Sequence, residues 1–237
     1  MKGKKIVAAG AALLIALFFS THKPAAENVS TVKEADVKAA GSSRVQNTTS
    51  DDEDAWQLRL VNRWNPLPQY WSVNVIQLRN GQSIDERCYP DLQDMMDDCR
   101  AKGLSPVICS SYRTWARQEE LFNAEVDLLK NQGYSDEKAR EKAGTAIAVP
   151  GTSEHQLGLA ADIVDSNYQS LDKGQEDTPV QKWLMKNSWK YGFILRYPNG
   201  KSDITGIIYE PWHYRYVGKE AAKEIYQRGI CLEEYLD

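Results

Sequence analysis

Two short stretches of this 237-residue chain hold both histidines that lie outside its N-terminal leader, and each stretch also carries an acid. The first reads SEHQLGLAAD over residues 153–162, and the second reads EPWHYR over residues 210–215. A catalytic zinc takes three protein ligands and keeps a fourth position open, and two neutral imidazoles with one carboxylate meet that need. The sequence therefore predicts a fold that brings His155, Asp162 and His213 together as a hydrolytic metal centre.

The local context of the first stretch supports this prediction. His155 lies in a loop bracketed by Gly and Ser, residues 151–158, which runs into a strand-like segment, residues 159–164. A polar loop that enters a strand can turn both side chains toward one point. Asp162 interrupts an apolar run, where an unpaired carboxylate would be costly to bury. A ligand role is favoured over the alternative of a solvent-facing Asp162 on a half-buried strand.

In the second stretch, Glu210 lies three residues before His213, and Pro211 follows it directly. Because Pro211 fixes its own backbone angle and biases the preceding residue toward an extended conformation, Glu210 and His213 do not form a helical pair. Glu210 can then lie near the metal without binding it. That position suits a general base, which activates water and returns the proton to the leaving amine. The simpler alternative is a salt bridge from Glu210 to Arg215.

The two stretches resemble the D-alanyl-D-alanine metallopeptidases of the VanY type, within the wider group of lysostaphin, D-Ala-D-Ala peptidases and hedgehog proteins. The first matches the spacing S-x-H-x-x-G-x-A-x-D, and the second matches E-x-W-H. The resemblance also takes in SSYRTWARQ, residues 110–118, and covers roughly residues 56–236. Two motifs with matching spacing and order make this a specific signal.

The resemblance implies a role for each matching residue. It implies one Zn²⁺ ion bound by His155, Asp162 and His213, with Glu210 as the catalytic base. Arg113 is implied to hold or polarise the substrate, and a planar guanidinium suits both a terminal carboxylate and a developing oxyanion. No position departs from the family pattern, so an active enzyme is expected.

Three further residues are weaker candidates for contact with the substrate. Gln118 lies one turn into a helix whose predicted N-cap is Thr114, where its amide can either donate to the substrate or simply be exposed. Ser153 and Tyr112 are the other two candidates, because each lies in one of the matching motifs.

The domain alternates predicted helices with short strands. Helices are predicted over residues 90–102, 135–143, 180–191 and 219–228, and a further helix is predicted to begin near residue 114. Strands are predicted over residues 104–110, 159–164, 192–197 and 212–217. Helical spacing predicts that one face of the helix that begins near residue 114 is buried, namely Trp115, Phe122, Val126 and Leu129. We expect an α+β domain, with a small, mainly antiparallel sheet, flanking helices and a zinc-containing cleft, as in hedgehog and D-Ala-D-Ala peptidases.

The N-terminal part predicts export. Three lysines precede fourteen apolar or small residues, a run that is short for a membrane span and typical of a signal-peptide core. Residues 1–23 are predicted to be a signal peptide or an N-terminal membrane anchor. Residues 24–54 hold no aromatic, Leu or Ile side chain and predict a flexible polar linker. Residues 55–237 are predicted to form the zinc D,D-carboxypeptidase-like catalytic domain, and the expected location is extracellular or in the cell envelope.

Charge limits the partners that this chain can take. Loss of residues 1–26 would remove four lysines and change the formal net charge from −4 to −8. Because nucleic-acid binding requires a basic surface, no nucleic-acid partner is expected. The expected partner is a peptidoglycan stem peptide, and the expected state is a monomer with possible N-terminal attachment to the membrane.

Four cysteines, an even number in a chain predicted to be exported, invite disulfides. Cys88 and Cys99 lie at either end of a predicted helix whose rise separates them by roughly 13 Å or more, so their direct pairing is disfavoured. Cys99 either bonds Cys109 or packs inside the domain. The connectivity of the four cysteines stays open, and in an anaerobic or reducing niche all four, Cys231 included, would remain thiols.

The leading function is a zinc carboxypeptidase that removes the terminal D-alanine from peptidoglycan stem peptides. An L,D-carboxypeptidase that acts on tetrapeptide stems is one alternative, and a non-catalytic, zinc-stabilised module that binds the cell wall is another. Glu210 argues against the module, because a structural site does not require an unligated base. A non-heme iron oxygenase is disfavoured, because such enzymes usually place the acid two residues after the first histidine.

Overall fold

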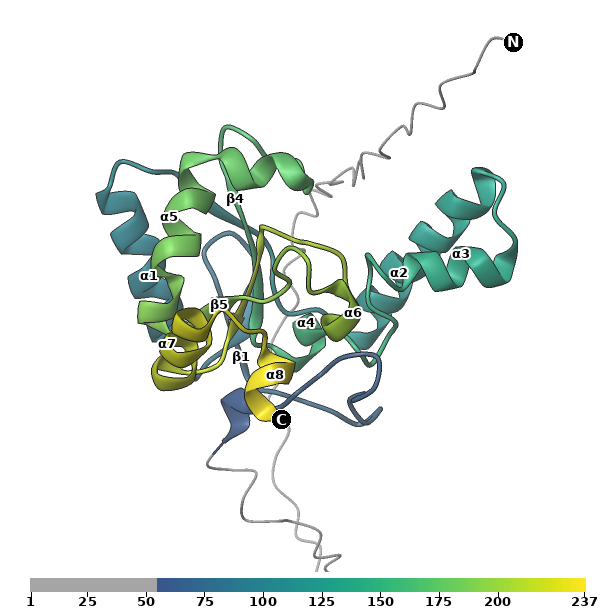
Figure 1. Ribbon diagram of the computed structural model, residues 1–237, viewed down its shortest axis with the longest axis horizontal. Coiled ribbons are helices and arrows are strands. Elements are labelled where there is room, and N and C mark those ends of the chain that lie inside the picture. The colour runs from purple at the N-terminus through teal and green to yellow at the C-terminus, as the bar shows by residue number, and fades with distance from the viewer. Residues whose placement is uncertain (1–54) are drawn as a thin grey trace, which may run out of the picture.

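The domain contains a four-stranded antiparallel sheet and a two-stranded sheet, with helices packed around them (Figure 1). The computed structural model describes residues 55–237, so the predicted leader at residues 1–23 and linker at residues 24–54 lie outside the described residues. The strands are β1 (Val75–Gln77), β2 (Ser83–Asp85), β3 (Pro106–Ser110), β4 (Ala160–Asp165), β5 (Phe193–Leu195) and β6 (His213–Tyr216). The larger sheet has the order β3-β4-β6-β5.

Each of the five predicted helices is present, and the described residues form several further short helices that the sequence did not predict. The α-helices are α1 (Tyr89–Ala101), α2 (Trp115–Asn131), α3 (Asp136–Ala143), α4 (Glu154–Leu157), α5 (Pro179–Asn187), α6 (Ser202–Thr205), α7 (Lys219–Arg228) and α8 (Leu232–Leu236). The 3-10 helices are η1 (Trp56–Leu58), η2 (Lys173–Asp177) and η3 (Ser188–Tyr191). The predicted α+β class is confirmed.

Alternation of side chains along β4 and β6 gives the larger sheet one apolar face and one polar face. Successive residues of a strand point to opposite faces. Ala161 and Ile163 of β4 and Tyr214 of β6 belong to the main hydrophobic core. Asp162 and His213 therefore point to the other face, and the strand register pairs these two residues directly.

Helices α1 and α5 cover the apolar face of the sheet (Figure 1). Helix α1 presents the stripe that its spacing predicts, with Leu92, Met95 and Cys99 fully buried. Helix α5 adds Val180 and Leu184 to the same core. Each fully buried aliphatic side chain of this kind contributes roughly 1.5–3 kcal/mol relative to exposure. This packing fixes the strands that carry the polar site on the opposite face.

Helices α2 and α3 form a hairpin that projects from the rest of the domain (Figure 1). Phe122, Val126 and Leu129 of α2 pack against Ala139 and Ala143 of α3 in a separate small core. The three α2 residues are buried as predicted. The hairpin therefore has its own apolar core, separate from the main one.

The first turn of α2 differs from the prediction in one position. Thr114 caps the helix as predicted, because its hydroxyl oxygen accepts from the backbone N–H of Arg117. Trp115 is only half-buried, however, and Gln118 takes the inward position in the buried stripe. Trp115 instead lies over Gly151, where even a Cβ atom would come within 2.7 Å of the indole ring.

The cysteines do not form a disulfide anywhere in the described part of the chain. Cys88 and Cys99 pack in the main core, so of the two outcomes left open for Cys99 the structure shows packing. Cys109 is half-buried on β3, where its thiol donates to the backbone carbonyl of Asp162. Burial raises the pKa of the Cys109 thiol to about 12, so it is held as a neutral thiol.

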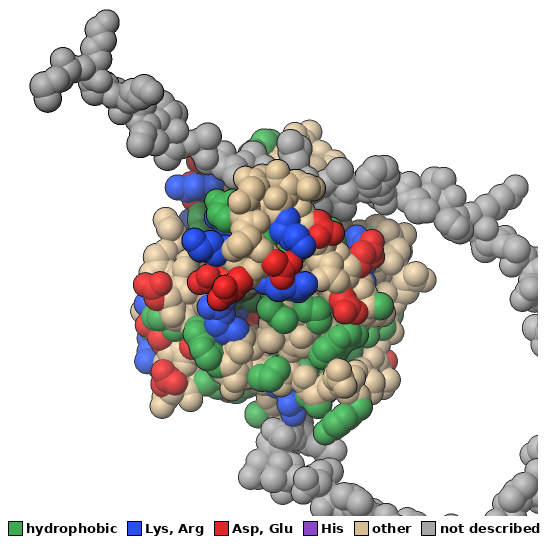
Figure 2. Space-filling view, turned by 90° about the vertical axis from the view of Figure 1, so that its right-hand side faces the viewer, with side chains coloured by type: hydrophobic (Ala, Val, Ile, Leu, Met, Phe, Trp, Pro, Cys, Tyr) green, Lys and Arg blue, Asp and Glu red, His purple; other side chains and the backbone are tan. Residues whose placement is uncertain are grey.

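The surface mixes charges of both signs. On the face shown in Figure 2, basic and acidic side chains are interspersed in the upper part, and apolar side chains gather below them. The hairpin carries exposed ion pairs of this kind, such as Arg117 with Glu120 and Lys130 with Asp136. Within residues 55–237, no helix has both the length and the apolar character that crossing a bilayer requires.

Candidate metal centre

The three predicted ligands meet on the polar face of the sheet. Asp162 and His213 lie opposite each other on β4 and β6, and α4 brings His155 over them. One ligand atom from each residue lies within 4.8 Å of the other two. All three side chains are buried, with exposed fractions of 2–4%. Two imidazole nitrogens and one carboxylate are donors that suit Zn²⁺, so the site fits one zinc ion.

Helix α4 explains how His155 reaches this point. The segment predicted as a loop over residues 151–158 contains one helical turn, Glu154–Leu157, which corrects that expectation. The turn ends at Gly158, whose φ of +88° lies in the left-handed region that favours glycine. A Cβ atom there would also lie 3.1 Å from Val73 Cγ1. Gly158 thus ends the helix and starts β4 within two residues, which places His155 above Asp162.

A backbone carbonyl fixes the orientation of His155. Its Nδ1 lies 2.7 Å from the carbonyl oxygen of Ser111, which can only accept, so Nδ1 carries the hydrogen. The lone pair of Nε2 then points to the site, 3.2 Å from Asp162 Oδ2. A histidine that donates its far N–H in this way is prepared as a metal ligand.

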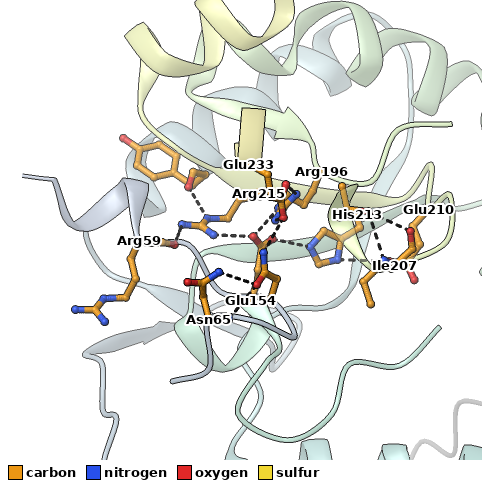
Figure 3. A network of polar contacts seen from close by, with 12 residues as sticks. Arg59, Asn65, Glu154, Arg196, Ile207, Glu210, His213, Arg215 and Glu233 are labelled. Carbon is orange, nitrogen blue, oxygen red and sulfur yellow. Dashed lines mark hydrogen bonds and ion pairs between the residues drawn. The ribbon is translucent and has the colours of Figure 1, made fainter. Parts of the chain in front are cut away.

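Two carboxylates fix the orientation of His213. Its Nδ1 lies 3.0 Å from Asp162 Oδ1 inside the site. Its Nε2 lies 3.2 Å from Glu154 Oε2 on the other side of the ring (Figure 3). Nδ1 is therefore the nitrogen that faces the metal. The two histidines use different ring nitrogens, because the outer acceptor lies at Nδ1 of His155 but at Nε2 of His213.

Burial and neighbouring charges set the protonation of the three ligands. Burial, with Arg113 as a further cause, lowers the pKa of His155 to about 4, so it is neutral near pH 7. Burial alone would raise the pKa of Asp162, but the two histidines outweigh it and hold that pKa well below its usual range. Burial alone would lower the pKa of His213, but hydrogen bonds to Asp162 and Glu154 raise it to about 9.

These pKa values predict that zinc binds more tightly as the pH rises. Near neutral pH and without metal, the three ligands hold one proton between them, on His213, whereas His155 and Asp162 are already deprotonated. Zinc must displace that proton, so its affinity is expected to rise about tenfold per pH unit below pH 9. Competition with a chromogenic chelator at several pH values measures how the zinc affinity changes with pH. An affinity that does not change between about pH 6 and about pH 8 would contradict it.

A tight turn places Glu210 beside the ligands. The backbone N–H of His213 donates to the carbonyl oxygen of Glu210 at 3.2 Å, with Pro211 in the second position of the turn. Glu210 Oε2 lies 3.8 Å from His213 Nδ1. Burial raises the pKa of Glu210 to about 8, with the charge of Asp162 adding to the rise and His213 opposing it. The alternative salt bridge is not formed, because the Arg215 guanidinium donates to Glu154.

Arg113 also lies at the site. Its Nη2 donates to Asp162 Oδ2 at 2.9 Å, and Nε and Nη2 both donate to Ser110 Oγ. Gln118 accepts from Arg113 Nη1 at 3.3 Å and donates through Nε2 to the carbonyl oxygen of Ala148 at 2.7 Å. Since Gln118 is fully buried and does not line the cavity, its predicted contact with substrate is corrected to support of Arg113.

A cavity of about 450 Å³ opens above the ligands. Arg113, Glu210, Ser153 and Tyr112 line it together with the three ligands. Another wall is apolar and comes from α2 and from the segment after α3, with Leu121, Ala146, Ile147 and Ala148. The segment between residues 111 and 150 thus shapes the cleft, as its lack of strands suggests.

Several residues that support the site escape prediction from the sequence. They are Ser111, Glu154, Arg196 and Arg215, and all four are buried. Glu154 directly precedes His155 in the first motif, and this position is the feature of the sequence that could have pointed to its role at the site. Its burial could not be foreseen, because a single helical turn shows no hydrophobic periodicity.

Comparison with known proteins gives the family. A sequence profile described as VanY, D-alanyl-D-alanine carboxypeptidase, matches residues 81–219. A D-alanyl-D-alanine carboxypeptidase of Enterococcus faecalis is 51% identical over 186 residues, which cover 78% of this chain and 68% of that protein. The profile match spans the three ligands, Glu210 and all but one of the residues that line the cavity, and it confirms the enzyme class that the two motifs predict.

Two solved structures resemble the domain. The structure of VanYB in complex with D-alanine-D-alanine has a TM-score of 0.70 and 51% identity, over 76% of this chain and 97% of that one. A mutant of the vancomycin resistance D,D-pentapeptidase VanY, from a VanB-type cassette and in complex with Zn(II), has a TM-score of 0.70 and 50% identity, over 77% and 99%. The chain therefore belongs to the VanY family of zinc-dependent D-alanyl-D-alanine carboxypeptidases.

Proposed function

We propose that this chain hydrolyses the terminal D-Ala-D-Ala bond of peptidoglycan stem peptides and releases D-alanine. The observation that carries the proposal is the placement of a buried, unligated Glu210 next to a buried His-Asp-His set. Similarity to VanYB in complex with D-alanine-D-alanine supports the choice of substrate. The small apolar wall formed by Ala146, Ile147 and Ala148 suits the methyl groups of alanine residues.

In this proposal His155, Asp162 and His213 hold zinc, which when bound supplies a Lewis acid for the scissile carbonyl and makes water more acidic. Glu210 takes the proton from water, whose oxygen adds to the carbonyl carbon. Glu210 then delivers that proton to the amine of the departing D-alanine as the C–N bond breaks. Arg113 donates hydrogen bonds either to the developing oxyanion or to the terminal carboxylate.

Hydrolysis of defined stem peptides tests this proposal. Zinc-loaded protein is incubated with a pentapeptide that ends in D-Ala-D-Ala and with the matching tetrapeptide, and the released D-alanine is measured by mass spectrometry. Release from the pentapeptide, lost after chelation and restored by zinc, is the expected result. Release from the tetrapeptide alone would establish the L,D alternative, and stable zinc binding with no release from either peptide would establish a wall-binding module.

Substitution of Arg113 by lysine tests the role of the planar guanidinium. Lysine keeps the positive charge beside Asp162 but cannot make paired, coplanar hydrogen bonds. We expect kcat/KM for the pentapeptide to fall by about 10²–10³-fold, the usual cost of losing a donor to an oxyanion, with zinc still bound. An unchanged kcat/KM would remove Arg113 from the catalytic site.

We further propose that the protein acts outside the cytoplasmic membrane, exported or tethered by residues 1–23. The composition of those residues and the location of peptidoglycan support this proposal. Fractionation of cells that express the full chain tests it. Recovery of the protein solely in the cytoplasm would contradict it.

A further inference from the structure

Glu154 is a buried carboxylate behind the metal centre, and the reaction proposed above does not use it. Its exposed fraction is 1%, and it lies on α4 next to His155. Glu154 Oε2 lies 3.2 Å from Nε2 of His213, on the side of the ring that faces away from the ligand cluster. Figure 3 shows Glu154 between the His213 ring and two arginines.

The second oxygen of Glu154 is held by those two arginines. Arg196 Nε donates to Glu154 Oε1 at 2.6 Å, and Arg215 Nη1 donates to the same oxygen at 2.7 Å. Both guanidinium groups are fully buried. The two carboxylate oxygens of Glu154 thus have different partners: Oε1 accepts from the two arginines, and Oε2 accepts from His213.

The arginines are themselves anchored in the fold. Arg196 makes a two-point contact with Glu233, from Nη1 to Oε2 at 2.8 Å and from Nη2 to Oε1 at 2.7 Å. Arg215 Nη2 donates to the backbone carbonyl oxygens of Gln57 and Arg59. The two acids balance the two arginines in charge, so the cluster places no uncompensated charge behind the metal ligand.

From this geometry we infer that Glu154 is a positioning residue that keeps the hydrogen of His213 on Nε2 and leaves Nδ1 free to bind the metal. The inference rests on the proposed zinc function. A carboxylate oxygen can only accept, so Oε2 requires a donor at Nε2. A neutral imidazole with its hydrogen on Nε2 presents its lone pair at Nδ1, toward Asp162 and His155.

Replacement of Glu154 by glutamine tests the inference, because the amide has one acceptor instead of two. Arg196 and Arg215 both require an acceptor, so the amide oxygen must face them. The NH₂ group then faces His213 Nε2 and donates to it. That contact moves the hydrogen of His213 to Nδ1, where it blocks the metal.

Glu233→Gln is the matched control. It makes the same change of charge in the same buried cluster, and Glu233 contacts Arg196 and Asn62 instead of His213. Zinc affinity is measured by chelator competition for the wild-type protein and both variants. The visible absorption of the Co²⁺ forms reports the ligand geometry, and thermal unfolding of the metal-free forms reports the structural cost.

The expected result is that Glu154→Gln weakens zinc binding by about 10–100-fold or more and alters the Co²⁺ spectrum. Glu233→Gln is expected to lower the unfolding temperature but to keep the wild-type Co²⁺ spectrum, with a loss of affinity below about tenfold. Unchanged zinc affinity in Glu154→Gln, or an equal loss in both variants, would overturn the inference. A wild-type protein that binds no zinc would instead overturn the proposed function.

Discussion

Replacement of Glu210 by alanine is expected to lower kcat for the pentapeptide by about 10²–10⁴-fold while the protein still binds one zinc ion. Glu210 is buried beside the ligands but lies 3.8 Å from the nearest nitrogen of His213, and three other side chains supply the ligand atoms. Its loss therefore removes a proton acceptor and leaves the metal set intact. Initial rates and zinc content of the same preparation measure the two effects.

Glu210→Gln is the control for volume. It keeps the size and shape of the side chain and cannot accept the proton, so its loss of kcat should match that of Glu210→Ala. Loss of zinc in either variant would show that Glu210 is a ligand or supports one, against the role assigned to it. Activity close to that of the wild type in Glu210→Gln would show that the proton transfer uses another group.

Replacement of His155 by alanine is expected to abolish zinc binding at chelator concentrations that the wild type withstands, and activity with it. The change removes one of three ligands and leaves the carbonyl oxygen of Ser111 without its partner. The loss of affinity should exceed the roughly 10–100-fold that an outer hydrogen-bond partner costs. Chelator competition measures the affinity, and excess zinc in the assay tests whether activity returns.

Ser153→Ala provides the matched control for His155→Ala. Ser153 precedes α4, lines the same cavity and is equally buried, but its side chain makes no capping hydrogen bond to the helix within the described structure. This variant should keep zinc affinity. A His155→Ala protein with the wild-type affinity would remove His155 from the ligand set.

The three metal ligands could be predicted from the sequence, because they lie in two short motifs with characteristic spacing. The spacing in residues 153–162 and 210–215 names the donors, and strand alternation then places Asp162 and His213 on one face. The start of α2 follows from its cap, Thr114, and its buried face follows from apolar spacing at Phe122, Val126 and Leu129, though not at Trp115. Motif spacing, strand alternation and helix caps depend on residues that are close together in the chain, so they can be recognised in a single sequence.

The support of the site could not be predicted, because it depends on contacts between distant segments. Glu154 and Glu233 are far apart in the chain, and Arg196 joins them only after β5 and α8 have packed. The burial of Gln118 instead of Trp115 in the first turn of α2 also results from contacts with residues outside the helix. Gln118 faces inward because Arg113 and a backbone carbonyl oxygen satisfy its amide there, and helical spacing carries no information about those partners.

We expect one zinc ion to lie among His155, Asp162 and His213, with Glu210 beside it and not bound to it. Anomalous diffraction at the zinc edge from crystals of the zinc-loaded protein locates that ion. The predicted result is a single peak at about 2.0–2.2 Å from His155 Nε2, His213 Nδ1 and an oxygen of Asp162, with Glu210 outside that distance. A peak at another place, or none in crystals that contain zinc, would contradict it.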